Sequence, residues 1–265
     1  YAGGLAFELP FGTLYSPNIT PDRETGISGW SDEQFVKALQ EGIGPEGDHY
    51  YPAFPYTSYT KMPREDILAI KAYLFSLDPV EQSAPENDIA FPFNQRWGLY
   101  FWNLLFLDEG RFEPDPDRSE DWNRGAYLVT GPGHCGECHT PRNLFQAMDS
   151  SERLAGADLG GWRAYNISGS DSHGIGTWTE EQLVNYFRQG YAEGLGVAGG
   201  PMAEVVELSL RHLNDRDLRA IATYLKQTEP QATGLPRPTP LADTLAAPEQ
   251  PGLGSKVFAQ ACASC

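Results

Sequence analysis

Basic residues and long apolar runs are scarce in this chain of 265 residues. Only 19 lysine and arginine residues stand against 36 aspartate and glutamate residues, which gives a formal net charge of −17. An acidic surface repels a polyanion, so the charge balance excludes nucleic acid as an expected partner. The longest apolar run, residues 97–107, is shorter than the roughly 20 residues that a helix needs to span a membrane.

The composition also excludes intrinsic disorder, because hydrophobic residues make up 40% of the chain and aromatic residues 12%. The 28 glycines and 21 prolines predict many turns and a modest helix content. The chain opens at Tyr1 without an initiating methionine or a leader, and it stops at Cys265 in the middle of a motif. We therefore expect an internal piece of a longer protein.

Cysteine is equally sparse, yet its arrangement is informative. The four cysteines form two C-x-x-C pairs: Cys135, Cys138, Cys262 and Cys265. The first pair continues as C-G-E-C-H through His139, a pattern typical of covalent haem c attachment. Two thiols one helical turn apart can each add to a vinyl group of one porphyrin. His139, directly after them, is then expected to be the proximal iron ligand.

Two other interpretations of the cysteines have less support. The pairs of a four-cysteine zinc site usually lie about 15 to 20 residues apart, whereas these lie 127 apart. A thioredoxin-like pair needs a βαβ context with buried parallel strands, and no runs rich in valine or isoleucine flank these cysteines. Haem attachment is favoured, with a structural metal or a disulfide as the alternative.

Two stretches of the chain are related by a nearly constant offset. Residues 18–42 match residues 166–190 at an offset of 148, which keeps N-I, G-I, W, E-Q, V and G in register. Residues 66–79 match residues 217–230 at an offset of 151. Two homologous domains are the simplest explanation.

Each copy is expected to contain a pair of helices. The first helix of each pair begins at a capping box, after Ser31 or Thr179, and stops at a glycine. The second covers residues 66–79 or 217–230 and is expected to end at a proline. The fold class predicted from this pattern is mostly α, with long irregular loops.

The offset also predicts the domain boundaries and the number of haems. A counterpart of the residue 135–139 motif would lie upstream of Tyr1, and the residue after Cys265 is expected to be histidine. Three haem domains are therefore expected in the parent protein. The expected parts are a first domain lacking its attachment motif (1–79), a connector with an aromatic helix (80–118), a complete second domain (119–230), a proline-rich linker (231–251) and the start of a third domain (252–265).

The connector contains the aromatic run at residues 97–107, which is apolar on nearly all sides. Such a helix is expected to be buried, either between the domains or against a partner subunit. Packing between the domains is favoured, because buried core helices are the commoner case.

Several motifs together resemble a known family. They are N-I-T-P-D at 18–22, G-W-S-D-E at 29–33, Y-P-A-F-P-Y at 51–56 and C-G-E-C-H-T-P-R-N at 135–143. These motifs resemble the triheme cytochrome c subunit of membrane-bound bacterial dehydrogenases, such as quinoprotein alcohol dehydrogenase and flavin-dependent gluconate dehydrogenase.

This resemblance implies tandem class I cytochrome c domains that carry covalent haem c. Their expected role is to pass electrons from a dehydrogenase catalytic subunit to ubiquinone or an oxidase at the periplasmic face of the membrane, without substrate chemistry of their own. It leaves membrane association of the parent complex open.

A class I domain needs a second axial ligand, usually a methionine sulfur. Met202, in a glycine-rich loop 63 residues beyond His139, is the candidate for the second haem. Met62 is the candidate for the first haem, with His49 as the alternative ligand and core packing as the other explanation of the methionine.

Arg142, three residues after the expected iron ligand, is a candidate partner for a haem propionate, because a guanidinium matches a carboxylate. An exposed arginine is the alternative.

Two other functions remain as alternatives to electron transfer. A multihaem peroxidase would need one haem with an open sixth position, and the unassigned ligand of the first haem keeps that alternative open. The third hypothesis is a binding module whose fold is held together by metal bound at the C-x-x-C pairs.

Overall fold

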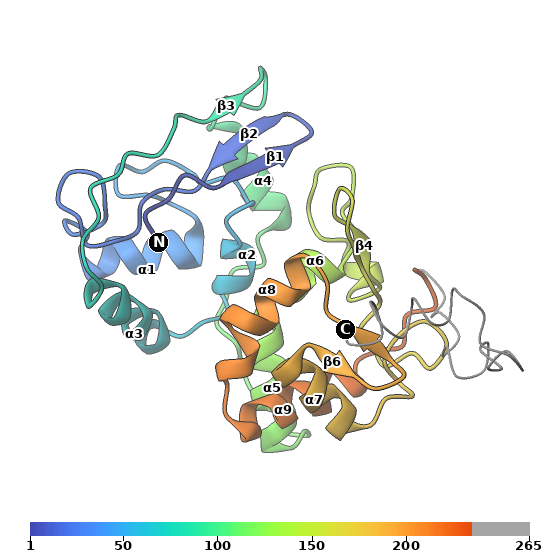
Figure 1. Ribbon diagram of the computed structural model, residues 1–265. Helices are drawn as coiled ribbons and strands as arrows, with labels where there is room; N and C mark the ends of the chain where they lie inside the picture. Colours follow the sequence, from blue (N-terminus) through green and yellow to red (C-terminus); the bar gives the residue numbers. More distant parts are fainter. Residues whose placement is uncertain (235–265) are drawn as a thin grey trace, which may run out of the picture.

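The computed structural model describes residues 1–234 (Figure 1). Most of the proposed linker, the start of the proposed third domain, Cys262 and Cys265 lie outside these described residues. In chain order the elements are β1 (Ala6–Leu9), β2 (Gly12–Tyr15), α1 (Asp32–Glu41), α2 (Tyr56–Tyr59), α3 (Arg64–Phe75), β3 (Asp88–Ile89), α4 (Gly98–Phe106), α5 (Glu120–Thr130), α6 (Gly136–His139), η1 (Ser150–Glu152), β4 (Ala157–Asp158), β5 (Arg163–Ala164), α7 (Glu180–Gln189), β6 (Tyr191–Ala192), β7 (Gly196–Val197), α8 (Pro201–Leu208), η2 (Leu210–His212) and α9 (Asp215–Lys226).

The mostly α class is confirmed. In the described part of the chain, the strands form a three-stranded antiparallel sheet, β1-β2-β3, and two short hairpins, β4-β5 and β6-β7. Among residues 1–234, no helix has the length and apolar character needed to cross a membrane.

The predicted capping boxes are present at α1 and α7. The Ser31 hydroxyl accepts a hydrogen bond from the Gln34 N–H at 3.1 Å, and the Gln34 side chain accepts one from the Ser31 N–H at 2.9 Å. The same two bonds join Thr179 and Gln182, at 3.1 and 2.8 Å. The local sequence therefore fixes the start of both helices.

Both helices also end in the same way. Gly42 and Gly190 follow α1 and α7 in the left-handed region, with φ of 67° and 73°, where a side chain would be strained. The carbonyl of Gly42 accepts from the Tyr50 N–H, and that of Gly190 accepts from the Ala198 N–H, both at 2.7 Å. Tyr50 and Ala198 are again 148 residues apart.

A buried asparagine holds the segment that follows the last helix in each copy. The Asn18 amide donates to the Val80 carbonyl at 2.7 Å, and the Asn166 amide donates to the Gln231 carbonyl at 3.0 Å. Each asparagine oxygen also accepts from the backbone N–H two residues further on. The segments that the offset pairs thus share detailed local geometry, whereas their assignment as tandem cytochrome domains stays a prediction.

Helices α5 and α9 cross closely in the second half of the chain. Gly125 of α5 faces the backbone of α9, and a methyl group at Gly125 would lie 1.9 Å from the Ala220 carbonyl oxygen. Only a glycine permits this approach.

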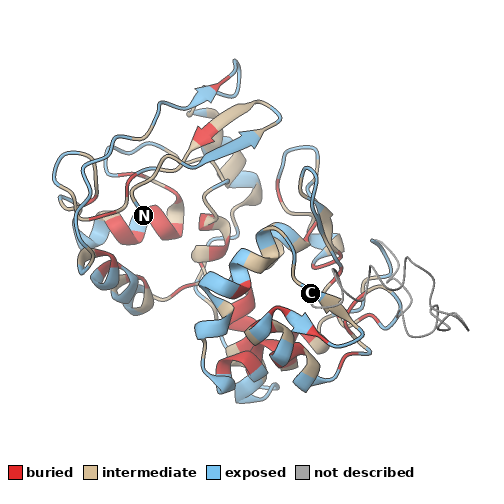
Figure 2. Cartoon of the chain, in the orientation of Figure 1, coloured by how far each residue is buried: buried red, intermediate tan, exposed pale blue. Residues whose placement is uncertain are grey.

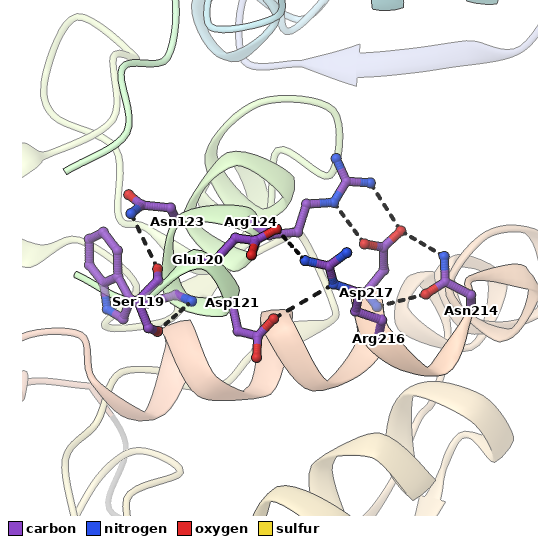
Figure 3. A network of polar contacts seen from close by, with 9 residues as sticks. Ser119, Glu120, Asp121, Asn123, Arg124, Asn214, Arg216 and Asp217 are labelled. Atoms are coloured by element: carbon purple, nitrogen blue, oxygen red, sulfur yellow. Dashed lines mark hydrogen bonds and ion pairs between the residues drawn. The ribbon is translucent and has the colours of Figure 1, made fainter. Parts of the chain in front are cut away.

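Charged side chains reinforce the crossing (Figure 3). The Arg124 guanidinium donates two hydrogen bonds to the Asp217 carboxylate, at 2.7 and 3.0 Å. Asn214, the N-cap of α9, also donates to this carboxylate, and Arg216 pairs with Glu120. The Arg124 guanidinium, through its hydrogen bonds, holds the pKa of Asp217 below its usual range.

The two halves of the chain share one set of buried apolar residues that spans α1, α3, α5, α7 and α9. Met62 and Tyr127 lie in this set, and the Tyr127 hydroxyl donates to the Asp66 carboxylate of α3. Phe112 packs near Tyr127 with ring centroids 5.8 Å apart. The seam between the halves is therefore formed by the segment after α2 and by α5.

The predicted burial of the aromatic helix between the domains is wrong. No residue of α4 is buried, and in Figure 2 the helix carries only the intermediate and exposed colours. Five side chains are between 55% and 73% exposed: Trp97, Tyr100, Phe101, Leu104 and Leu105. One side of the helix does contact the second half, where the Trp102 indole N–H donates to the Phe145 carbonyl at 2.9 Å. The apolar side chains extend around the whole helix, so contacts on one side leave the other sides exposed.

Candidate haem-attachment site

Helix α5 leads directly to the first cysteine through a tight connection. The Gly133 N–H donates to the Leu128 carbonyl at 2.8 Å, and the Cys135 N–H donates to the Val129 carbonyl at 3.1 Å. A methyl group at Gly133 would lie 2.5 Å from the Leu128 oxygen, so glycine is required there. The end of α5 thus fixes the position of the attachment turn.

The attachment turn itself is α6, one turn of helix. The His139 N–H donates to the Cys135 carbonyl at 3.0 Å, which places both cysteines and the histidine on a single turn. Cys135 and Cys138 are both free thiols. Burial raises the pKa of Cys135 to about 12 and raises that of Cys138 as well. These raised pKa values differ from the lowered pKa of the reactive cysteine in a redox pair.

The His139 imidazole is held from behind by a backbone carbonyl. Its Nδ1 lies 2.7 Å from the Tyr165 oxygen. A carbonyl only accepts, so Nδ1 carries the proton and Nε2 keeps its lone pair. Burial lowers the pKa of His139, which favours this neutral form. An imidazole with a fixed Nδ1–H and a free Nε2 has the form that binds iron.

A long loop after α6 brings that carbonyl into place. The His139 carbonyl accepts from the Gly156 N–H at 2.8 Å, and the Thr140 hydroxyl accepts from the Leu154 N–H at 3.1 Å. Gly156 has a φ of 91°, and a methyl group there would lie 2.6 Å from the Ala164 oxygen. No sequence signal points to the Tyr165 carbonyl, because any residue type supplies one.

Arg142 has a different partner from the one expected. Its guanidinium donates to the Glu137 carboxylate at 2.5 Å and to the Glu137 carbonyl at 2.9 Å. Binding of a propionate by Arg142 therefore stays a prediction, and Glu137 is a residue that the sequence reasoning missed.

Met202 lies in the first turn of α8 and not in a loop as expected. Pro201 begins this helix, a position where its missing N–H costs nothing. Gly200, with φ of 49°, packs under the Trp162 ring, and a methyl group there would lie 2.4 Å from that ring. Met202 is half-buried, and iron ligation by its sulfur stays a prediction.

The candidate ligands of the first haem lie in different surroundings. Met62 is 1% exposed in the seam between the halves, and its carbonyl accepts from the Gln40 amide at 2.9 Å. His49 lies 3.3 Å from the Asn103 amide and faces the Tyr100 ring of α4. Ligation by either residue remains untested.

Backbone geometry identifies the true counterpart of Met202. The antiparallel bridge between Ile43 and His49 recurs at the same offset of 148 between the first residue of β6 and the last residue of β7. The turn hydrogen bond from the Phe54 N–H to the Tyr51 carbonyl also recurs at this offset, from the Met202 N–H to the Gly199 carbonyl, so Phe54 corresponds to Met202. Phe54 packs edge-on against the Tyr59 ring, with centroids 5.6 Å apart. The sequence reasoning missed Phe54 because it compared only methionines.

The donor set at the attachment turn fits haem c. Cys135 and Cys138 are free thiols on one turn, and His139 directs a free Nε2 away from the Tyr165 carbonyl. Within residues 1–234, no group of three or more histidine, cysteine or acidic side chains could hold a metal ion. The described part of the chain therefore offers no alternative cluster for a structural metal.

Comparisons with known proteins agree with this chemistry, although no protein-family model matches the chain. A nicotinate dehydrogenase subunit of Pseudomonas putida is 49% identical over all of this chain and 22% of its own length. The gluconate 2-dehydrogenase cytochrome c subunit of Pantoea cypripedii is 38% identical over all of this chain and 63% of its own length. This chain therefore spans less than two thirds of either protein.

A shorter relative is matched over most of its length. A diheme c-type cytochrome of Cereibacter sphaeroides is 40% identical over 85% of this chain and 75% of its own length. Together with the C-G-E-C-H turn, these matches show that the chain belongs to the family of c-type cytochromes that includes the cytochrome subunits of bacterial dehydrogenases.

Proposed function

We propose that this chain is part of a multihaem c-type cytochrome that relays electrons and does not act on substrate. It would receive electrons from the catalytic subunit of a dehydrogenase and pass them to a quinone or a terminal oxidase at the periplasmic face of the membrane. The observation that carries the proposal is the geometry of His139, whose Nδ1 lies 2.7 Å from the Tyr165 carbonyl, on the same turn as two free thiols. The names of the relatives support the dehydrogenase partner.

The residues of the attachment turn have distinct roles in this proposal. Cys135 and Cys138 would hold haem c through two thioether bonds, and His139 would bind the iron through Nε2. Met202 would supply the second iron ligand. The bound haem supplies one-electron exchange between Fe(II) and Fe(III). The hydrogen bond to the Tyr165 carbonyl fixes the imidazole orientation and increases its basicity.

The parent protein is proposed to carry three haems. The repeat and the second C-x-x-C pair, Cys262 and Cys265, support this number. The diheme relative defines two haems as the competing outcome. Mass spectrometry of the denatured full-length protein counts covalent haems directly, and a mass with fewer than three would overturn the proposed number.

The test of the function uses the full-length protein, produced with a c-type maturation system and its cognate dehydrogenase. We expect a haem c pyridine haemochrome spectrum and reduction of the haem by dehydrogenase plus substrate. His139→Gln should abolish the low-spin spectrum of one haem, whereas His212→Gln, a matched change at an exposed histidine, should not. A protein without covalent haem, or one that the dehydrogenase cannot reduce, would contradict the proposal.

A second candidate function is peroxide reduction. It is favoured by one observation, the phenylalanine at position 54 where the second copy has Met202, because a phenylalanine cannot ligate iron. A first haem with an open sixth position would react with peroxide and carbon monoxide. Peroxide turnover by the reduced full-length protein distinguishes this function from electron relay alone.

A further inference from the structure

Glu137, inside the haem-attachment turn, is a nearly buried carboxylate with three side-chain donors. Its side chain is only 10% exposed. One carboxylate oxygen accepts hydrogen bonds from the hydroxyls of Thr57 at 3.0 Å and Ser58 at 3.1 Å. The other accepts from the Arg142 guanidinium at 2.5 Å. We call these four residues the attachment junction.

The junction connects parts of the chain that are far apart in sequence. Thr57 and Ser58 belong to α2, in the first half, and Glu137 and Arg142 lie in and just after α6. Both hydroxyls that bond to Glu137 therefore come from the first half. These hydrogen bonds therefore connect the turn that carries the candidate haem ligands directly to the first half.

Contacts next to the attachment junction show that it is part of the packed seam between the two halves. The Tyr59 ring lies 5.6 Å from the His134 ring, next to the first cysteine. Burial raises the pKa of Tyr59 to about 12, and the Glu137 charge contributes in the same direction. Met62 packs toward Gly131, at the end of α5.

A carboxylate in this position needs compensation. Removing a charge from water is costly unless partners replace the lost hydration. The three donors of the junction supply that replacement, one of them as a charged guanidinium. An accidental surface pair would not require hydroxyl donors from the other half of the chain.

We propose that Glu137 is a positioning residue that fastens the attachment turn to α2 and, together with Arg142, tunes the haem bound there. This inference rests on the proposed function, because it assumes that haem c is attached at Cys135 and Cys138. Ferric haem carries one more positive charge than ferrous haem, so a nearby carboxylate favours the ferric state and lowers the reduction potential. Arg142 acts in the opposite direction.

The experiment is a redox titration of the full-length cytochrome and four variants. Glu137→Gln should raise the potential of one haem, because it removes the negative charge but keeps the shape. Arg142→Gln should lower the potential of the same haem. Thr57→Val, an isosteric change outside the attachment turn, should lower it as well, because a hydroxyl donor to the carboxylate is lost. Glu193→Gln removes the same charge from an exposed loop and should leave all potentials unchanged.

A second measurement tests the pairing itself. In a double-mutant cycle on unfolding, the Glu137→Gln and Arg142→Gln effects should not be additive, because residues in contact are coupled. Additive effects would overturn the pairing and favour a propionate as the partner of Arg142. Haem potentials that do not respond to Glu137→Gln, or that respond equally to Glu193→Gln, would overturn the tuning. Failure of the parent protein to attach haem would instead refute the proposed function, and the unfolding cycle would still report on the junction.

Discussion

Substituting Gly125 by alanine should destabilise the crossing of α5 and α9. The added methyl group would lie 1.9 Å from the Ala220 oxygen and 2.6 Å from its carbonyl carbon. These are backbone atoms of a helix, so they cannot move aside as a flexible side chain would. Overpacking of a core costs roughly 1 to 3 kcal/mol, and a backbone clash belongs at the upper end. Alanine recovers about 1 kcal/mol through its higher helix propensity. The expected net loss is about 2 kcal/mol.

The assay is denaturant unfolding of the full-length protein, followed by far-ultraviolet circular dichroism and by its haem c absorbance. Gly98→Ala is the matched control, because Gly98 opens α4 and a methyl group there contacts nothing within 4 Å. The control should be neutral or slightly more stable than the parent. Equal stability of Gly125→Ala and the parent would refute the close crossing, since its clash should outweigh the gain in helix propensity.

Three further outcomes follow from other contacts. Arg124 lowers the pKa of Asp217, so this pair stabilises the fold above the ordinary aspartate pKa and loses its effect as the pH falls through the lowered value. Asp217→Asn should therefore weaken the decline of the melting temperature in acid. Leu104→Ser in the exposed face of α4 should change the unfolding free energy by less than about 0.5 kcal/mol and reduce retention on a hydrophobic column. Asn166→Ala should cost roughly 1 to 3 kcal/mol in thermal unfolding, because it removes the donor to two carbonyls beyond α9.

The parts of the fold that the sequence predicts correctly depend on short-range interactions. The capping boxes at Ser31 and Thr179 involve residues only three positions apart, and the left-handed glycines end the same helices. The attachment turn is equally local, because five consecutive residues contain both thiols and the histidine. These features need no knowledge of the rest of the chain.

The environment of the aromatic helix, by contrast, depends on distant residues. Apolar composition predicts that α4 is buried, but burial requires a surface on the other side. Contacts from the described chain reach Trp102, Asn103 and Phe106, through the Phe145 loop and the Tyr56 hydroxyl. Nothing in the sequence of residues 97–107 indicates which side that surface covers.

The candidate site likewise combines a motif that the sequence shows with contacts that it does not show. Cys135, Cys138 and His139 form a recognisable motif, whereas the contacts that orient them come from distant positions. Tyr165 contributes a carbonyl that leaves no trace in its residue type, and Thr57 contributes a hydroxyl from 80 positions before Glu137. The Tyr165 carbonyl reaches His139 through the fold of the loop after α6, and the Thr57 hydroxyl reaches Glu137 only when the two halves are packed together.

The register of the two copies also explains why Met62 does not correspond to Met202. Hydrogen bonds keep the offset of 148 as far as Phe54 and Met202, and from Met62, whose N–H bonds to the Tyr59 carbonyl as that of Leu213 does to Leu210, the offset is 151 through α3 and α9. The net insertion therefore falls between them, with Phe54 before it and Met62 after it. At the later offset, Met62 matches Leu213, and both pack against the buried apolar core. The backbone thus aligns Met62 with Leu213 and leaves Phe54 where the second copy has its candidate sulfur ligand, so the two copies differ chemically at that position, and ligation by Met62 stays a prediction.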